Sequence, residues 1–255
     1  MDRKERWSKS KTFSRNKVID CHCHFDMMDS PEDFIKRMEK EGHTIIGMTN
    51  RPCYFEQGIR HINPHGKIRL ALGLHPLELG HAEDDLRDFA ACVDKTSYIG
   101  EIGLDFSSEG RDKADLQIAC FEDILRILSD KSKILSIHTR QAEREALDLL
   151  DSFYQENVIF HWYTGNSGLI PEIVDHGYYF SINEAMVCSA RGRDLISKIP
   201  KDRVLTESDA PYNTRTDIRR AIEELARMWY MSSHDVEVVI ENNFKTLLNS
   251  LKKRN

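Results

Sequence analysis

Short apolar runs alternate with longer amphipathic segments along nearly the whole chain. The apolar runs predict strands at 18–25, 43–49, 68–75, 98–104, 134–139, 157–162, 178–183 and 203–208. The segments between and after them have helical spacing and predict helices at 31–41, 54–62, 83–94, 112–129, 141–155, 168–176, 189–198, 215–230 and 235–252. Strands that alternate with helices in this way indicate a parallel sheet.

Eight strand–helix units in 255 residues favour a closed (β/α)8 TIM barrel built as one domain, with an open doubly wound sheet as the alternative. No Gly-rich phosphate loop follows the first strand, and no Pro/Gly/Ser linker divides the chain. We expect the barrel to span residues 18–255. Residues 1–17 contain seven Lys or Arg and two acidic residues, which predicts a flexible basic lead-in or, alternatively, an arm that touches phosphate.

The charge and cysteine content narrow the function classes. A net charge of -6 argues against a broad basic groove for long DNA, but it leaves room for local binding through metal ions and a few arginines. The longest apolar runs are far shorter than a membrane span, and a secretory signal is missing. Six scattered cysteines without CxxC pairs predict reduced thiols and a cytoplasmic protein.

The first predicted strand, VIDCHCHF, carries two histidines two residues apart. Side chains alternate along a strand, so His22 and His24 should share one face, while Cys21, Cys23 and Phe25 should face the other way. We expect the two cysteines to pack under helices. Two imidazoles at this spacing can chelate one metal ion, or they can pair in a polar core. The residues at the ends of later strands favour the metal.

Barrels of this type carry their chemistry at the carboxyl ends of the strands. Ligand-type side chains recur at these ends, namely His22, His24, Glu101, His138, His161 and Asp209. Mixed nitrogen and oxygen ligands suit Zn²⁺ or Mn²⁺. Six ligands exceed the needs of one tetrahedral ion, so we expect two divalent ions bridged by Glu101, with Asp209 orienting the attacking water and taking its proton. Glu207 shares a strand face with Asp209 and is a further candidate ligand.

Six motifs, HCHFD, GLHP, EIGLD, IHTR, HWYTG and TESDAP, resemble in their order and spacing the TatD family of metal-dependent hydrolases. The resemblance extends over residues 18–252. It implies an amidohydrolase-like barrel, Mg²⁺ or Mn²⁺ as cofactor, and deoxyribonuclease activity. It places the family's metal ligands on the six strand-end residues and its accessory carboxylate on Glu207. Together with the negative net charge, it suggests single-stranded DNA or DNA ends as the substrate.

Two motifs depart from the family pattern. Trp162-Tyr163-Thr164-Gly165 stands where members usually have a Cys-Phe-Ser-Gly-like run, which alters the rim of the pocket. Glu207-Ser208-Asp209 stands where Glu-Thr-Asp is usual. These features and the basic lead-in resemble the divergent TatD-like proteins of bacterial antiphage gene clusters, such as the QatD component of Qat systems. That resemblance implies a role in antiviral defence and protein partners within a defence system.

Four residues near the strand ends are candidate substrate contacts. Arg140 suits a phosphate, or else a structural ion pair. His75 resembles the family's pocket-lining histidine, although capping a loop would explain it equally well. Trp162 and Tyr163 could stack on a base or pack at the rim. Asp105, four residues after Glu101, is predicted to support a ligand histidine.

Two other functions remain open at this point. One is a barrel hydrolase that cleaves amide or ester bonds of a small molecule. A carbamylated lysine bridging the metals would favour it, but Glu101 occupies the expected bridging position. The other is a non-catalytic component of an assembly in which the metals are structural. A complete ligand set that includes Asp209 argues against this second function.

Overall fold

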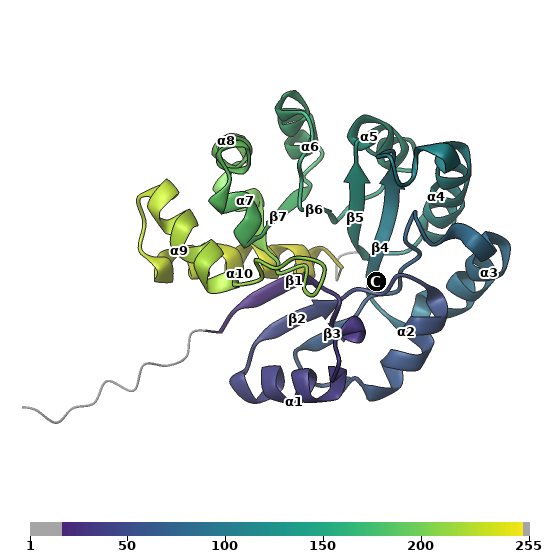
Figure 1. Ribbon diagram of the computed structural model, residues 1–255, viewed down its shortest axis with the longest axis horizontal. Coiled ribbons are helices and arrows are strands. Elements are labelled where there is room, and N and C mark those ends of the chain that lie inside the picture. The colour runs from purple at the N-terminus through teal and green to yellow at the C-terminus, as the bar shows by residue number, and fades with distance from the viewer. Residues whose placement is uncertain (1–16, 252–255) are drawn as a thin grey trace, which may run out of the picture.

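The computed structural model describes residues 17–251, and it contains eight parallel strands in the predicted places (Figure 1). They are β1 (Ile19–Cys23), β2 (Thr44–Gly47), β3 (Ile68–Leu70), β4 (Tyr98–Asp105), β5 (Ile134–Arg140), β6 (Val158–His161), β7 (Tyr179–Ile182) and β8 (Val204–Thr206). The basic lead-in predicted at 1–17 lies, except for Lys17, outside the described residues.

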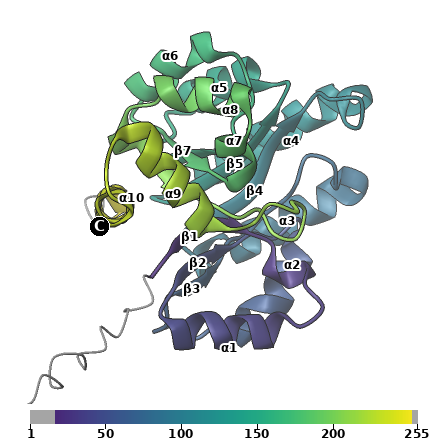
Figure 2. The same ribbon diagram turned by 60° about the vertical axis from the view of Figure 1, so that its left-hand side comes forward.

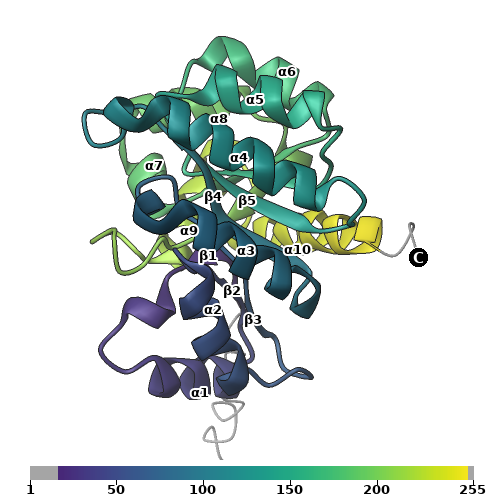
Figure 3. The same ribbon diagram turned by 90° about the vertical axis from the view of Figure 1, so that its right-hand side faces the viewer.

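The helices lie outside the strands (Figure 1; Figure 3). They are α1 (Pro31–Glu41), α2 (Pro52–Gly58), α3 (Ala82–Cys92), α4 (Ala114–Leu128), α5 (Glu143–Ser152), α6 (Ile170–Asp175), α7 (Glu184–Cys188), α8 (Ala190–Lys198), α9 (Ile218–Trp229) and α10 (Ser233–Ser250). The short α7 was not predicted. It is capped by Asn183, whose side chain accepts a hydrogen bond from the Met186 backbone N–H. Within residues 17–251, no helix is both long and apolar enough to cross a membrane.

The strands pair in chain order, in a sheet of β1–β3 and a sheet of β4–β8. The two sheets meet at two seams. At the β3–β4 seam, Leu72 pairs with Ile99. At the β8–β1 seam, Thr206 Oγ1 donates to the Ile19 carbonyl and the Asp209 N–H donates to the His22 carbonyl. These contacts complete the ring of strands of the predicted (β/α)8 barrel.

The floor of the barrel is apolar and is closed by the last helix. Side chains of several strands and of α10 form one buried cluster there, which consists of Cys21, Ile46, Met48, Ala71, Ile134, Ile159, Tyr179, Leu205, Phe244 and Leu247. Figure 2 shows α10 beside α9 and close to β1. A larger apolar cluster fills the layer between the strands and the outer helices. The predicted ligand side chains lie at the opposite, carboxyl end of the barrel.

An irregularity in β1 corrects the expectation for its cysteines. The pairing of β1 with β2 shifts register between Asp20 and Cys23. Asp20 Oδ1 accepts hydrogen bonds from the backbone N–H groups of His22, at 3.2 Å, and Ser208, at 3.0 Å. Because a register shift interrupts the simple alternation of faces, Cys21 packs in the barrel floor rather than under the outer helices. Cys23 packs in the outer layer, as predicted.

Candidate metal centre

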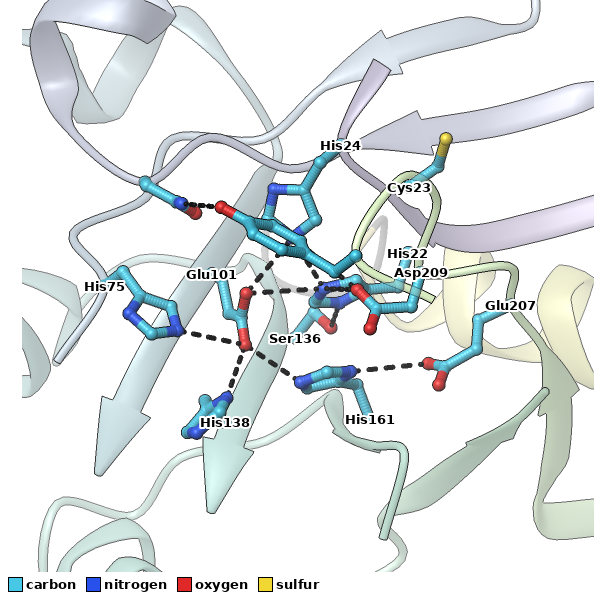
Figure 4. Close-up of polar contacts among 12 residues, drawn as sticks. His22, Cys23, His24, His75, Glu101, Ser136, His138, His161, Glu207 and Asp209 are labelled. Atoms are coloured by element: carbon cyan, nitrogen blue, oxygen red, sulfur yellow. Dashed lines mark hydrogen bonds and ion pairs between the residues drawn. The ribbon is translucent and has the colours of Figure 1, made fainter. Parts of the chain in front are cut away.

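Seven side chains from six strands and the segments that follow them converge at the carboxyl end of the barrel around Glu101 (Figure 4). We call His22, His24, His75, Glu101, His138, His161 and Asp209 the Glu101 cluster. Glu101 Oε1 lies 2.7 Å from His138 Nδ1, 2.9 Å from His161 Nε2 and 3.5 Å from His75 Nε2. Glu101 Oε2 lies 3.1 Å from His24 Nε2 and 3.5 Å from His22 Nε2. The two carboxylate oxygens therefore face two different groups of imidazoles.

The first donor set consists of His22, His24, Glu101 and Asp209. The Nε2 atoms of His22 and His24 are 3.2 Å apart, and Asp209 Oδ1 lies 3.7 Å and 3.8 Å from them. Four ligand atoms that surround one Zn²⁺-sized ion tetrahedrally are separated by about 3.3–3.6 Å. Two imidazole nitrogens and two carboxylates that face each other at this spacing repel unless a proton or a cation lies between them. These residues fit a divalent ion.

The second donor set consists of the other Glu101 oxygen, His138, His161 and His75. His75, Glu101 and His138 offer ligand atoms within 4.8 Å of one another, as do His22, Glu101 and His161. The two sets share Glu101, so its carboxylate is placed where a bridging ligand is needed. The number of ions that the cluster holds stays a prediction.

Neighbouring polar groups orient the ligand histidines. Asp105 Oδ2 lies 2.9 Å from His138 Nε2, and Ser136 Oγ lies 2.8 Å from His22 Nδ1. A partner on the outer ring nitrogen fixes which nitrogen of an imidazole can bind a metal. The contact of Asp105 with His138 is the one that its predicted supporting role requires. Ser136 was missed, although its position two residues before His138 on β5 places it on the same strand face.

Gly103 allows β4 and β5 to approach each other closely beside the ligands. It pairs with His138 and has a φ of +131°, which side chains rarely permit. A Cβ atom at this position would lie 2.1 Å from the His138 carbonyl oxygen. Any larger residue would therefore push β4 away from β5 at His138.

The charges of the cluster are balanced by protons in the absence of an ion. Burial alone would raise the pKa of Glu101, but His75 and His161 hold it well below its usual range. Burial opposes a charge on His161, yet the carboxylates of Glu101 and Glu207 raise its pKa well above the usual value. Burial and the neighbouring His161 lower the pKa of His22 well below its usual value, so His22 is neutral, the form of an imidazole that can bind a metal. A bound cation would replace the protons on His138 and His161, the two imidazoles whose pKa values the neighbouring carboxylates raise.

Asp209 occupies a special backbone conformation at the edge of the cluster. Its φ of +50° lies in the left-handed region, which Asp tolerates better than most residues. Burial raises the pKa of its carboxyl group to about 7, and the nearby carboxylates of Glu101 and Glu207 add to this rise while His161 opposes it. Asp209 thus combines a ligand position with a pKa near neutrality.

Glu207, predicted as a further ligand, lies behind the cluster and outside both donor sets. Its Oε2 atom is 3.7 Å from His161 Nδ1. Its carboxylate accepts hydrogen bonds from Ser181 Oγ and, at 2.9 Å, from Asn183 Nδ2. A residue two positions earlier along a strand lies about 7 Å deeper in the barrel, so sharing a face with Asp209 does not bring Glu207 to the same depth. Its position suits holding His161.

A cavity of about 600 Å³ opens above the Glu101 cluster. Three of the four predicted substrate contacts line it, namely His75, Arg140 and Trp162. The half-exposed Arg140 donates to Glu109 Oε1 at 3.2 Å, and Glu109 also lines the cavity. His75 Nδ1 accepts from the Leu77 N–H at 3.2 Å, so this residue caps a loop and faces the cavity at once.

The fourth predicted contact, Tyr163, does not reach the cavity, and its proposed stacking on a base is wrong. Its side chain is 0% exposed, packs against Phe160 and Phe180, and donates its hydroxyl to the Asn166 carbonyl at 2.7 Å. Trp162 has a φ of +36°, which ends the strand abruptly and changes the direction of the next side chain. Trp162 therefore lines the cavity, while Tyr163 enters the core.

Comparisons with known proteins agree with this architecture. The family model described as TatD related DNase matches residues 19–249. An uncharacterized metal-dependent hydrolase of Methanocaldococcus jannaschii is 26% identical over 244 residues, which cover 89% of this chain and 95% of that protein. Deoxyribonuclease TATDN3 of Homo sapiens is 25% identical over 257 residues, covering 89% and 93%. The crystal structure of YjjV, a TatD homologue from Escherichia coli, has a TM-score of 0.80 at 21% identity and covers 90% of this chain and 97% of its own; this likeness confirms the predicted fold.

Proposed function

We propose that this chain, which belongs to the TatD-related DNase family of metal-dependent hydrolases, cleaves phosphodiester bonds of DNA at the Glu101 cluster. The observation that carries the proposal is the pair of donor sets sharing the Glu101 carboxylate, with Asp209 at the edge of an open cavity. Deoxyribonuclease names among the relatives support DNA over a small-molecule amide or ester.

The residues divide the chemistry among themselves. His22, His24, Glu101 and Asp209 would hold one divalent ion, and Glu101, His138, His161 and His75 would hold a second. Divalent ions in such a site supply positive charge to a phosphate and lower the pKa of water. Asp209, which lines the cavity beside the cluster, accepts the proton of the attacking water as the general base. Glu101 stays ionised and fixes the spacing of the two donor sets.

The cavity favours a chain end over a continuous duplex. Its volume of about 600 Å³ is of the size that accepts one small ligand, whereas a double helix lies over a wide surface. Arg140 on the rim is placed to bind a phosphate once it exchanges Glu109 for the substrate. We therefore propose single-stranded DNA or DNA ends as the substrate. The role in antiphage defence rests on residues 162–165, residues 207–209 and the basic lead-in, and it stays a prediction.

The test is cleavage of end-labelled single- and double-stranded DNA by chelator-treated protein across Mg²⁺, Mn²⁺ and Zn²⁺. We expect metal-dependent cleavage that Asp209→Asn abolishes and that Asp94→Asn retains, because Asp94 is an exposed residue paired with Lys131. The product ladder gives the polarity. Two bound ions without cleavage of any DNA would overturn the proposal and direct the search to small esters and amides.

A further inference from the structure

Tyr212, in the loop that follows β8, presents an aromatic ring at the cavity beside the metal ligands. The residue lines the cavity, yet it is 54% exposed. Its ring meets the His24 imidazole edge to face, with centroids 4.8 Å apart and an interplanar angle of 83°. A large ring left open to solvent at the mouth of a polar pocket is available for contact with a ligand.

Asn50, after β2, holds this ring and leaves one polar atom unused. Its Nδ2 donates to the Tyr212 hydroxyl at 2.8 Å. The residue is only 8% exposed and lines the cavity, and its buried Oδ1 has no hydrogen-bond partner among the described residues. A buried acceptor without a donor costs free energy, which a donor brought by a ligand would recover.

The segment that carries Asn50 is firmly anchored. The next residue, Arg51, donates from Nε and Nη2 to the two carboxylate oxygens of the buried Asp85, at 3.2 Å and 3.0 Å. The Asn50 carbonyl accepts from the His75 N–H at 2.9 Å. Asn50 therefore joins the Tyr212 ring to the wall that also carries His75. A preorganised wall of this kind loses little entropy when a ligand docks.

We propose that Tyr212 and Asn50 form a recognition site for the base of an unpaired terminal nucleotide. The Tyr212 ring stacks on the base, and Asn50 Oδ1 accepts an N–H from its edge. This inference rests on the proposed nuclease function and names the part of the substrate that the site reads. Every nucleobase has a π-face and an N–H donor on its pairing edge, and this edge is occupied in a duplex but free at a single-stranded end. The pair therefore selects frayed or single-stranded ends over paired ones.

The test compares two single-stranded oligonucleotides that differ only in the terminal nucleotide, one carrying a base and one carrying an abasic tetrahydrofuran. Loss of one stacked base corresponds to about a five- to hundredfold change. We expect Tyr212→Ala to lower kcat/KM on the normal end by that factor, mainly through KM, and to leave the abasic end unchanged. Tyr212→Phe should keep most of the native kcat/KM on the normal end because the aromatic ring remains. Asn50→Ala should lower kcat/KM for the oligonucleotide with the normal end only. Tyr230→Ala, at a fully exposed tyrosine outside the cavity, is the matched control and should leave kcat/KM unchanged for both oligonucleotides.

Direct binding separates a failure of this inference from a failure of the nuclease proposal. In parallel, dAMP and deoxyribose 5-phosphate are titrated into the Mn²⁺-treated protein and the Tyr212→Ala variant. If no DNA is cleaved but dAMP binds more tightly than the sugar phosphate only when Tyr212 is present, base recognition stands and the nuclease proposal falls. If Tyr212→Ala lowers kcat/KM equally for both oligonucleotides, or affinity equally for both small ligands, the residue merely shapes the metal site and the inference is overturned. Unchanged values for all ligands overturn it as well.

Discussion

Replacing Asp105 by asparagine removes one charge and tests how the second donor set is oriented. In the native protein Asp105 Oδ2 faces His138 Nε2 at 2.9 Å, and Oδ1 accepts from the Ser107 N–H at 2.9 Å. A carboxylate only accepts, so it keeps the His138 proton on Nε2 and leaves the lone pair of Nδ1 directed toward the metal position. An asparagine can direct its N–H₂ group at His138, which moves the imidazole proton to Nδ1 and removes the lone pair that faces the metal position. Alternatively, it can direct this group at the Ser107 N–H, which is itself a donor, so the native hydrogen bond to Ser107 is lost.

The expected loss follows from this choice. Removing an outer partner of a metal-bound histidine lowers metal affinity by about 10- to 100-fold, which is about 1.4–2.7 kcal/mol. Only the second donor set contains His138, so calorimetric titration of Mn²⁺ into chelator-treated Asp105→Asn should show one weakened binding event. The event assigned to His22, His24 and Asp209 should be unchanged.

The control is Asp94→Asn, which removes an exposed carboxylate paired with Lys131 and should leave both events unchanged. Circular dichroism and thermal unfolding without metal show whether Asp105→Asn still folds. A folded Asp105→Asn protein whose two affinities stay within about twofold of the native values would refute the tautomer argument. Equal weakening of both events would instead indicate a general disturbance of the cluster.

Three further outcomes are expected. Ser136→Ala should lower the Mn²⁺ affinity of the first donor set about tenfold in the same titration, because His22 Nδ1 loses its partner. A loss of affinity confined to the second donor set would contradict this assignment. Tyr163→Phe should lower the free energy of unfolding in urea by about 1 kcal/mol, through loss of the bond to the Asn166 carbonyl, and leave KM for DNA unchanged; a raised KM would restore Tyr163 as a substrate contact. Metal affinity should fall as the pH drops from 8 to 6, since protons compete for Asp209, whose pKa burial raises to about 7; equal affinities at both pH values would contradict this.

The barrel was predictable because its apolar runs and helical segments are regular. All eight strands and most helices occur where the pattern placed them, and the family resemblance drawn from the motifs is confirmed by the match over residues 19–249. The strand-end rule also brought His22, Glu101 and Asp209 together, because the carboxyl ends of parallel strands in a barrel meet at one face. These predictions need only periodicity and chain order.

The failures lie where the backbone leaves regular geometry. Cys21 was misplaced because the register of β1 shifts, and Tyr163 because Trp162 adopts a positive φ. Neither departure has a local signature such as glycine or proline. Glu207 was predicted on the correct face of its strand but lies deeper in the barrel than the ligand positions. Strand alternation predicts which face a side chain occupies, but it does not predict how deep in the barrel the side chain lies. Tyr212 was missed because it belongs to a loop, where no periodicity indicates which way a side chain points.

The two seams of the barrel give the metal ligands a mechanical consequence. The first donor set takes His22 and His24 from the sheet of β1–β3 and takes Glu101 and Asp209 from the other sheet and the loop that follows it. An ion held by these residues would cross-link the two sheets at the β8–β1 seam, where few backbone hydrogen bonds connect the strands. A ligand that binds only the closed ring stabilises it by mass action. We therefore expect local opening at this seam in the metal-free protein, seen as faster hydrogen exchange at the His22 and Asp209 amides than in the middle of β5. Metal loading should remove this difference in exchange rate.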